Sequence, residues 1–467
     1  MVFNSIFFIF CFLPVFMLIY YLVPGKLRNL LLFLGSLIFY AWGEPVYVIL
    51  MLFSSIFNYY MGTELERLYY DDRKQKINLI FSIIINLAVL VFFKYYGFLL
   101  NTIGGIIGIH IPHPELSLPI GLSFYTFRNL SYLFDIYLSK VSAQRNFLTF
   151  SVYSTMFPYT SAGPIVRYTD IETQLKQRTI NISKFGIGAE LFVKGLAKKV
   201  LLADNLSVLY SSICGHPQMS VFTSWLGILA YTMQLYFDFS GYSDMAIGLG
   251  KMLGFDFNKN FDYPYISTSV SEFWRRWHIS LGSWFRDYIY IPLGGSRCSK
   301  WKSFRNTMII FLVSGLWHGA NWTFICWGAF HALLFLPLLL MGRNRKYKDI
   351  VAENKYLPSL KELGQIISTF ILVMIGWVIF RAENIKEAYQ YIIYMFTKWQ
   401  PSSLEYGVKC IQYIAILIII EWINRRKMHG LEINIKYPII RWGIYCAIFY
   451  YIFYYSNDIQ TFIYFQF

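Results

Sequence analysis

Apolar residues run along this chain in long blocks that are separated by short polar loops. The stretches 5–23, 77–93, 366–380 and 410–423 are almost entirely apolar. The longer blocks approach the roughly 20 residues that a helix needs to cross the hydrocarbon core of a bilayer. Backbone polar groups in lipid must be satisfied within the segment, and solid apolar runs lack the ten-residue alternation of a membrane barrel. The pattern therefore predicts an all-α, polytopic integral membrane protein.

The apolar blocks predict about eleven spanning helices, with the shorter or more polar blocks re-entrant or lying in the membrane interface. The blocks fall near 3–23, 29–42, 45–61, 77–101, 117–138, 146–162, 185–212, 219–250, 304–318, 320–341, 363–381, 409–423 and 436–456. We interpret the first block as a membrane helix, because it is longer than the apolar region of a signal peptide and no cleavage motif follows it. With no long linker and no repeat in the sequence, a single domain over residues 1–467 is expected.

Composition and charge support this class. Only 14% of the residues are charged, against about 25% in an ordinary soluble domain. The net charge of +15 comes from basic residues that gather in short loops, as the positive-inside rule expects on the cytoplasmic side. The expected partner is therefore the lipid bilayer, and not nucleic acid. The six cysteines are scattered without a CxxC pair, which predicts neither a metal site nor a disulfide framework.

One segment, residues 255–300, departs from the apolar pattern and is dense in Trp, Tyr, Arg and carboxylate. Ser269 and Glu272 have the spacing of a capping box, and the aromatic residues that follow cover most of a helix surface. We expect one amphipathic helix over 269–290 at the boundary of lipid and protein, ended by "IPLGG" at 291–295. Arg275, His278 and Arg286 recur along it near helical spacing, and Arg276 lies beside the first of them.

Ionisable side chains within apolar segments are costly and tend to mark function. In this sequence they are Arg128, Asp135, Lys194, Lys198, Lys199, Asp238, Asp244, His278, His318 and His331. Each also has a structural interpretation. The aspartates could pair with a cation and only fix packing, and the lysines could extend to the lipid headgroups. Gly163-Pro164 is interpreted as a helix break, and His331 could be a core histidine bonded to a carbonyl.

The motif "LWHGANW" at 316–322 places His318 beside the small Gly319, which leaves space next to the ring, with Asn321 three residues on. An imidazole exchanges protons near neutral pH. It can act as a general base toward an attacking hydroxyl or thiol, while a second histidine or an asparagine orients the donor or stabilises the oxyanion. A dry site would protect an activated acyl group from hydrolysis.

Other histidine chemistries have weaker support. His278, His318 and His331 could meet in space around zinc, but HExxH and HxxEH are absent from the sequence, so no metal is expected. A Ser-His-Asp hydrolase would need a GxSxG elbow, which is also absent. General-base chemistry is the simplest interpretation.

Seven motifs together resemble the membrane-bound O-acyltransferase (MBOAT) superfamily, in the branch similar to bacterial alginate O-acetyltransferases. They are "PIGLSFYTF", "AGPIVRY", "KGLAKKVLLADN", "YFDFSGYSDMAIGLGKMLGF", "NFDYPYISTSVSEFWRRWHISLGSWFRDYIYIPLGG", "GLWHGANWTFICWGAFHALL" and "WVIFRA". The resemblance covers about 119–382 and implies a multi-helix acyltransferase of the bacterial inner (cytoplasmic) membrane with a central funnel. It also implies that His318 is the catalytic residue and His278 the second motif histidine.

The resemblance further implies a function. An acetyl group would pass from a cytoplasmic donor, expected to be acetyl-CoA, across the membrane for O-acetylation of a cell-surface polysaccharide such as alginate or cellulose. No bound cofactor is expected. An extracytoplasmic acetyltransferase or esterase-like protein is the expected partner. The residues expected to line or support the passage are Trp317, Asn321, Arg275, Arg276, Asp238, Asp244 and His331. The arginines of 269–290, or Lys194 to Lys199, would meet the CoA phosphates.

Alternatives remain open at this point. "IPLGG" favours the polysaccharide branch over the branch that transfers D-alanine to teichoic acids, and peptidoglycan O-acetylation is a close alternative. Arg128-Asn129 departs from the branch, which more often has Gln with a small residue there. Two hypotheses of other classes are a transporter with a proton relay of Asp and His, and a non-catalytic scaffold of a polysaccharide export complex. The sequence shows no inverted repeat of the kind that would favour a transporter.

Overall fold

The computed structural model describes residues 1–114, 116–215, 219–342, 350–353, 355–400, 405–427, 437–455 and 462, and within these ranges it contains helices and no strand. The all-α class predicted from the sequence is confirmed. The chain forms two compact units, Met1–Phe192 with Tyr242–Asn258 and Val193–Gly241 with Lys259–Phe467. The expectation of a single domain stays a prediction.

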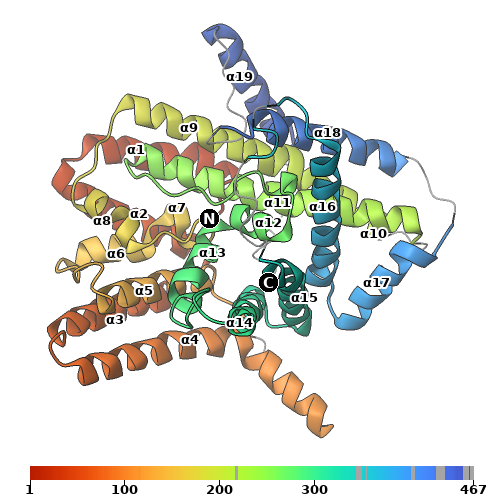
Figure 1. The fold of residues 1–467 in the computed structure, drawn as a ribbon. Helices are drawn as coiled ribbons and strands as arrows, with labels where there is room; N and C mark the ends of the chain where they lie inside the picture. The colour runs from red at the N-terminus through yellow and green to blue at the C-terminus, as the bar shows by residue number, and fades with distance from the viewer. Residues whose placement is uncertain are drawn as a thin grey trace. The chain divides into compact units, whose positions relative to one another are not determined.

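The first unit is built from helices that follow each other closely along the chain. They are α1 (Leu13–Leu22), α2 (Arg28–Gly43), α3 (Val48–Arg67), α4 (Asp72–Ile107), α5 (Leu122–Tyr137), α6 (Phe147–Thr155), α7 (Phe157–Thr160), α8 (Tyr168–Lys176) and the start of α9 (Ile182–Ala197). The helices α3, α4 and α5 pack against one another (Figure 1). Between them Asn58 donates a hydrogen bond to Asn86 at 3.0 Å, the type of polar contact that holds apolar helices together in a membrane.

Arg128 of α5 is fully buried in the first unit. Its guanidinium donates to the carbonyl oxygens of Tyr159 at 2.5 Å and Ser154 at 3.1 Å. These carbonyls lie near the ends of α6 and α7, where helical backbone acceptors have no partner in their own helix. The chain then turns at Gly163, whose φ is +109°, so the helix break expected at Gly163-Pro164 is confirmed. Arg128 stabilises this break.

The second unit contains the remaining helices. They are α10 (Asn205–Cys214), the first part of α11 (Val221–Met252), α12 (Val270–Arg276), α13 (Ile279–Phe285), α14 (Lys300–His318), α15 (Trp322–Leu340), α16 (Leu360–Arg381), α17 (Ile385–Thr397), α18 (Glu405–Asn424) and α19 (Pro438–Tyr455). In Figure 1, α14 and α15 lie side by side with α16 next to α15. Gly315 and Gly328 allow the close approach, because a Cβ on either would lie 2.2 Å and 2.3 Å from a carbonyl oxygen of the facing helix.

Five segments in the described part of the chain are long and apolar enough to cross a bilayer: α3, α4, α15, α16 and the 407–424 portion of α18. Shorter apolar helices cover Phe8–Leu22, where a π-helical turn runs into α1, and Gly443–Tyr454. These helices agree with a multi-pass membrane protein. The number of about eleven spans stays a prediction.

The single helix expected over 269–290 is wrong, because the structure breaks it at His278. α12 ends at Arg276, α13 begins at Ile279, and His278 between them has a left-handed backbone with φ 45°. The loop before α12 bonds to the broken ends: Ile279 donates to the Asn260 carbonyl and Asp262 donates to the Arg276 carbonyl, both at 2.9 Å. Periodicity along one segment cannot show such distant backbone partners. The turn expected at "IPLGG" is confirmed.

Candidate active site

His278 and His318 border the same cavity, of about 500 Å³, within the second unit. Its walls come from α12, α13, the turn after α13, α14 and α15. Aromatic and aliphatic side chains form most of the cavity surface, and nine of the nineteen lining residues have a polar or charged side chain: Ser271, Arg275, His278, Ser283, Arg286, Tyr290, Thr307, Ser314 and His318. An apolar hollow with a few converging polar groups is typical of a ligand or active site.

His318 is the last residue of α14 and is 6% exposed. Its ring is packed by aromatic neighbours, with centroid distances of 5.2 Å to Trp327 and 5.3 Å to Phe380. These edge-to-face contacts hold the imidazole in one orientation at the cavity wall. Gly319 does not leave the empty space that was expected beside the ring, since a Cβ there would lie 2.0 Å from the Phe324 ring. The glycine is needed because Phe324 fills that space.

His278 is 2% exposed and shares a polar contact that the sequence did not reveal. Its Nδ1 lies 3.2 Å from Oδ1 of Asn260, which also accepts the Ser280 N–H at 3.2 Å and the Ser280 hydroxyl at 2.9 Å. Among the described residues, Nε2 of His278 has no hydrogen-bond partner. α12 and α13 have seven residues each and are too short to span a bilayer. Burial lowers the pKa of His278 to about 3, so its imidazole is neutral at pH 7.

Trp317 lies against both histidines. Its indole centroid is 6.0 Å from the His278 ring and 5.0 Å from the His318 ring, in edge-to-face geometry. Trp317 is therefore a supporting residue that packs behind the cavity wall, since it is not itself among the lining residues. Of the other expected residues, Arg275 borders the cavity directly, and so does Arg286.

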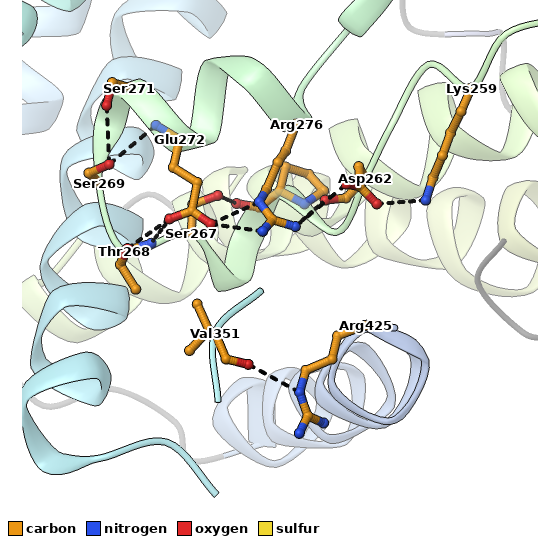
Figure 2. A network of polar contacts seen from close by, with 11 residues as sticks. Lys259, Asp262, Ser267, Thr268, Ser269, Ser271, Glu272, Arg276, Val351 and Arg425 are labelled. Carbon is orange, nitrogen blue, oxygen red and sulfur yellow. Dashed lines mark hydrogen bonds and ion pairs between the residues drawn. The ribbon is translucent and has the colours of Figure 1, made fainter. Parts of the chain in front are cut away.

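Arg276 does not line the cavity and is held in a buried polar network (Figure 2). Its guanidinium pairs with Glu272 at 2.9 Å and reaches Asp262 at 3.6 Å. Glu272 in turn accepts the Thr268 N–H at 2.8 Å, so only the Ser269 half of the expected capping box is formed. This network fixes α12 and so presents the neighbouring Arg275 to the cavity.

Asn321 also lies outside the cavity lining and serves as the N-cap of α15. Its Oδ1 accepts the Thr323 N–H at 3.1 Å, and its Nδ2 donates to the Glu383 carbonyl at 2.7 Å. Both ends of the amide are engaged in holding helix termini together. In this structure its geometry gives Asn321 a capping role, and does not place it to orient a reacting group.

His331 is fully buried in α15 and lies behind the cavity wall. The indole N–H of Trp274 donates to its Nδ1 at 3.3 Å. Trp274 lines the cavity, so His331 supports the site through this indole. The carbonyl partner considered from the sequence is replaced by a tryptophan of α12.

The lysine cluster is buried, so the expectation that these side chains extend to the headgroups is wrong. Lys199 is 3% exposed and lies 2.9 Å from Asp238 and 2.7 Å from Asp204. Lys194 and Lys198 are buried as well. A buried cation must be compensated by charge or hydrogen bonds. Asp238 makes the pairing with a cation that was its structural alternative, and it does not line the cavity. Asp244 belongs to the first unit and is partly buried.

Asn260 is the residue of this site that the sequence interpretation missed. It is the first residue of the motif "NFDYPYISTSVSEFWRRWHISLGSWFRDYIYIPLGG", but the motif does not show that its amide contacts His278. Its importance is visible only because the loop folds back onto the break between α12 and α13, where it is 1% exposed.

A helical membrane protein whose apolar cavity is bordered by two histidines belongs to the class of membrane-embedded enzymes. Residues 42–379 match the MBOAT, or membrane-bound O-acyltransferase, family. The chain belongs to this family and is an acyltransferase, as the sequence motifs indicated.

Characterised relatives differ in the group that they transfer and in the acceptor. The chain is 41% identical to the probable alginate O-acetylase of Pseudomonas aeruginosa, over 94% of this chain and 84% of that protein. It is 34% identical to the peptidoglycan O-acetyltransferase of Helicobacter pylori, over 83% and 78%. It is 30% identical to the teichoic acid D-alanyltransferase of Bacillus subtilis, over 59% and 71%.

Proposed function

We propose that this protein moves an acetyl group from acetyl-CoA on the cytoplasmic side of the bacterial inner membrane to a cell-surface polysaccharide such as alginate or cellulose. The observation that carries the proposal is that His278 and His318 border one largely apolar cavity. The identity to the probable alginate O-acetylase over most of both chains supports an acetyl group and a polysaccharide. About eleven spans and a central funnel complete the proposed architecture.

His318 is the proposed general base. It takes the proton of an attacking hydroxyl or thiol as the oxygen or sulfur bonds to the thioester carbonyl carbon. The C–S bond of acetyl-CoA then breaks, and the leaving CoA thiolate takes up a proton. The aromatic residues around His318 keep water away from the acetyl group, which limits hydrolysis.

Arg275 and Arg286 are proposed to bind the CoA phosphates, since both border the cavity and guanidinium groups pair well with phosphate oxygens. Lys199 is a poorer candidate, because two carboxylates already hold its ammonium group. An extracytoplasmic acetyltransferase or esterase-like partner is proposed to complete delivery to the sugar hydroxyl.

Peptidoglycan O-acetylation is the second candidate function, favoured by the Helicobacter pylori relative that aligns over 83% of this chain. The same chemistry would apply, with a different sugar hydroxyl as acceptor. D-alanyl transfer has less support, because that relative aligns over 59% of this chain. A transporter or a scaffold would not itself transfer an acyl group, so acetylation of the surface glycan would not depend on either histidine.

The test compares cells that carry the wild-type gene, a deletion, His318→Ala or His278→Ala. Ester-linked acetate is measured on surface glycans and on peptidoglycan, with the amount of each variant in the membrane as control. We expect His318→Ala to abolish the acetate and His278→Ala to cause a large, incomplete loss. Retained acetate in the His318→Ala strain would remove the catalytic assignment, and ester-linked D-alanine in place of acetate would overturn the proposed acyl group.

A further inference from the structure

The hydrogen bonds around Asn260 determine which nitrogen of His278 carries the proton. The Oδ1 position of Asn260 receives a backbone N–H, that of Ser280, at 3.2 Å. A backbone N–H can only donate, so the amide atom facing it must be the oxygen. The same oxygen lies 3.2 Å from Nδ1 of His278. Since an oxygen of this kind only accepts, Nδ1 must carry the hydrogen.

This tautomer leaves Nε2 of His278 with a lone pair. Nε2 is buried and has no hydrogen-bond partner within the described part of the chain. His278 borders the cavity and Asn260 does not, so Nε2 is the ring nitrogen left to a molecule in the cavity. A lone pair can accept a hydrogen bond but cannot donate one to an oxyanion.

We infer that Asn260 is a positioning residue that holds His278 as a hydrogen-bond acceptor, so that His278 orients a bound substrate through a donor group other than the proton that His318 removes and does not stabilise the oxyanion. The inference rests on the proposed acetyl transfer and deepens it. The backbone of His278 supports this role, because the residue is held in a left-handed conformation. Such conformations are strained and gather at functional sites.

Aromatic side chains surround the His278 ring in the part of the chain that the structure describes. The rings packed against it are Phe239, Phe261 and Trp317, with centroids at 4.7, 6.5 and 6.0 Å. The charged or titratable groups that border the same cavity are Arg275, Arg286, His318 and Tyr290. Burial lowers the pKa of His278, which keeps the ring in its neutral, accepting form.

Asn260→Asp separates this positioning role from simple capping. A carboxylate oxygen of Asp can still accept the N–H and the hydroxyl of Ser280, so the contacts with the start of α13 would be preserved. A carboxylate beside Nδ1 would, however, stabilise the imidazolium form and raise the pKa of His278. As pH falls through that raised value, Nε2 gains a proton and stops accepting. Activity on the acid side should therefore be lost at higher pH than in the wild type.

The experiment uses the full-length protein in liposomes and measures thiol release from acetyl-CoA between pH 5 and 9. We expect the acid limb of kcat for Asn260→Asp to move upward by one pH unit or more. Asn384→Asp makes the same change at the cap of α17 and should keep the wild-type profile. An Asn260→Asp profile that coincides with the wild-type profile would overturn the inference. Absence of thiol release in the wild type would instead count against the proposed function.

Asn260→Ala provides a second measurement that does not depend on recovering the Asp variant. Without the amide oxygen, the proton is free to sit on either nitrogen. We expect kcat to fall about tenfold or more while KM for acetyl-CoA stays within about twofold. A kcat equal to that of the wild type would show that Asn260 does not position His278.

Discussion

Lys199 forms a 2.9 Å ion pair with Asp238 in the interior of the second unit. The backbone makes a second pair possible, because Lys198–Asp204 is a π-helical turn. In an α-helix, residues five apart point about 140° away from each other at 3.6 residues per turn. The wider π turn brings Lys199 and Asp204 together at 2.7 Å. π-helical turns inside helices are often found at functional sites, and here the turn builds a buried cluster of charges.

Replacing Lys199 by Met should strongly destabilise the protein. The change leaves two buried carboxylates without their cation, and breaking a buried pair costs about 3–5 kcal/mol. Thermal unfolding in detergent, followed by size-exclusion chromatography, should show a clear loss of stability. Lys251→Met is the control, since its partner Asp256 is 48% exposed in its side chain and such pairs contribute about 0–1 kcal/mol. Equal stability of the two variants would contradict the role of the cluster.

Gly376→Ala should disturb the cavity indirectly, by displacing His331. A Cβ at Gly376 would lie 2.5 Å from Nε2 of His331, so the imidazole must move and its bond with Trp274 would be lost. Overpacking of this kind costs about 1–3 kcal/mol. We expect lower thermal stability and slower thiol release from acetyl-CoA.

Gly364→Ala is the matched control on the same helix, α16. No heavy atom lies within 4 Å of a Cβ at Gly364. Alanine is favoured over glycine in a helix by roughly 0.5–1 kcal/mol, so this variant should be as stable as the wild type or slightly more stable. A Gly376→Ala variant that behaves like Gly364→Ala would show that His331 tolerates displacement.

How far the sequence predicts this structure depends on where the partners lie. The all-α membrane class follows from long apolar runs, and the break at Gly163-Pro164 follows from local residues. The break at His278 could not be predicted, because its backbone partners Asn260 and Asp262 come from a preceding loop. The apolar pattern of residues 269–290 continues across the break as it would in one helix.

The candidate site shows the same division. The two motif histidines are recognisable in the sequence, and the structure brings both to one cavity. The roles predicted for the residues near these histidines were less accurate. A polar side chain beside a motif can simply cap a helix, as Asn321 caps the N-terminus of α15. The role of Asn260 was missed although the residue begins one of the motifs, because only the folded loop brings its amide to His278, eighteen residues further along the chain.

Arg275 and Arg286 should contribute to binding of acetyl-CoA and not to the stability of the fold. Arg275→Gln and Arg286→Gln are expected to raise KM for acetyl-CoA several-fold with little change in kcat, because each removes a charge that meets the CoA phosphates. The effect of the wild-type arginines should weaken as ionic strength rises. Arg276→Gln should instead lower thermal stability, since its partners are Glu272 and Asp262. An unchanged KM in both cavity variants would place the phosphates elsewhere.

The bond between Trp274 and His331 can be tested by a double-mutant cycle. His331→Phe alone leaves the buried indole N–H of Trp274 without its acceptor at 3.3 Å, which costs about 1–3 kcal/mol. Trp274→Phe removes the donor, and the pair of changes together leaves neither group unsatisfied. The double variant should therefore be more stable than the sum of the single losses predicts, by about 0.5–3 kcal/mol.

The cycle also distinguishes support from catalysis. His331 does not line the cavity and bonds to the cavity wall through the Trp274 indole, so once Trp274 is phenylalanine, the further change His331→Phe should have little additional effect on kcat. Thiol release from acetyl-CoA by the four proteins at saturating donor measures this directly. If His331→Phe lowers kcat by the same factor in both backgrounds, the histidine acts independently of the indole and belongs to the reacting machinery in its own right.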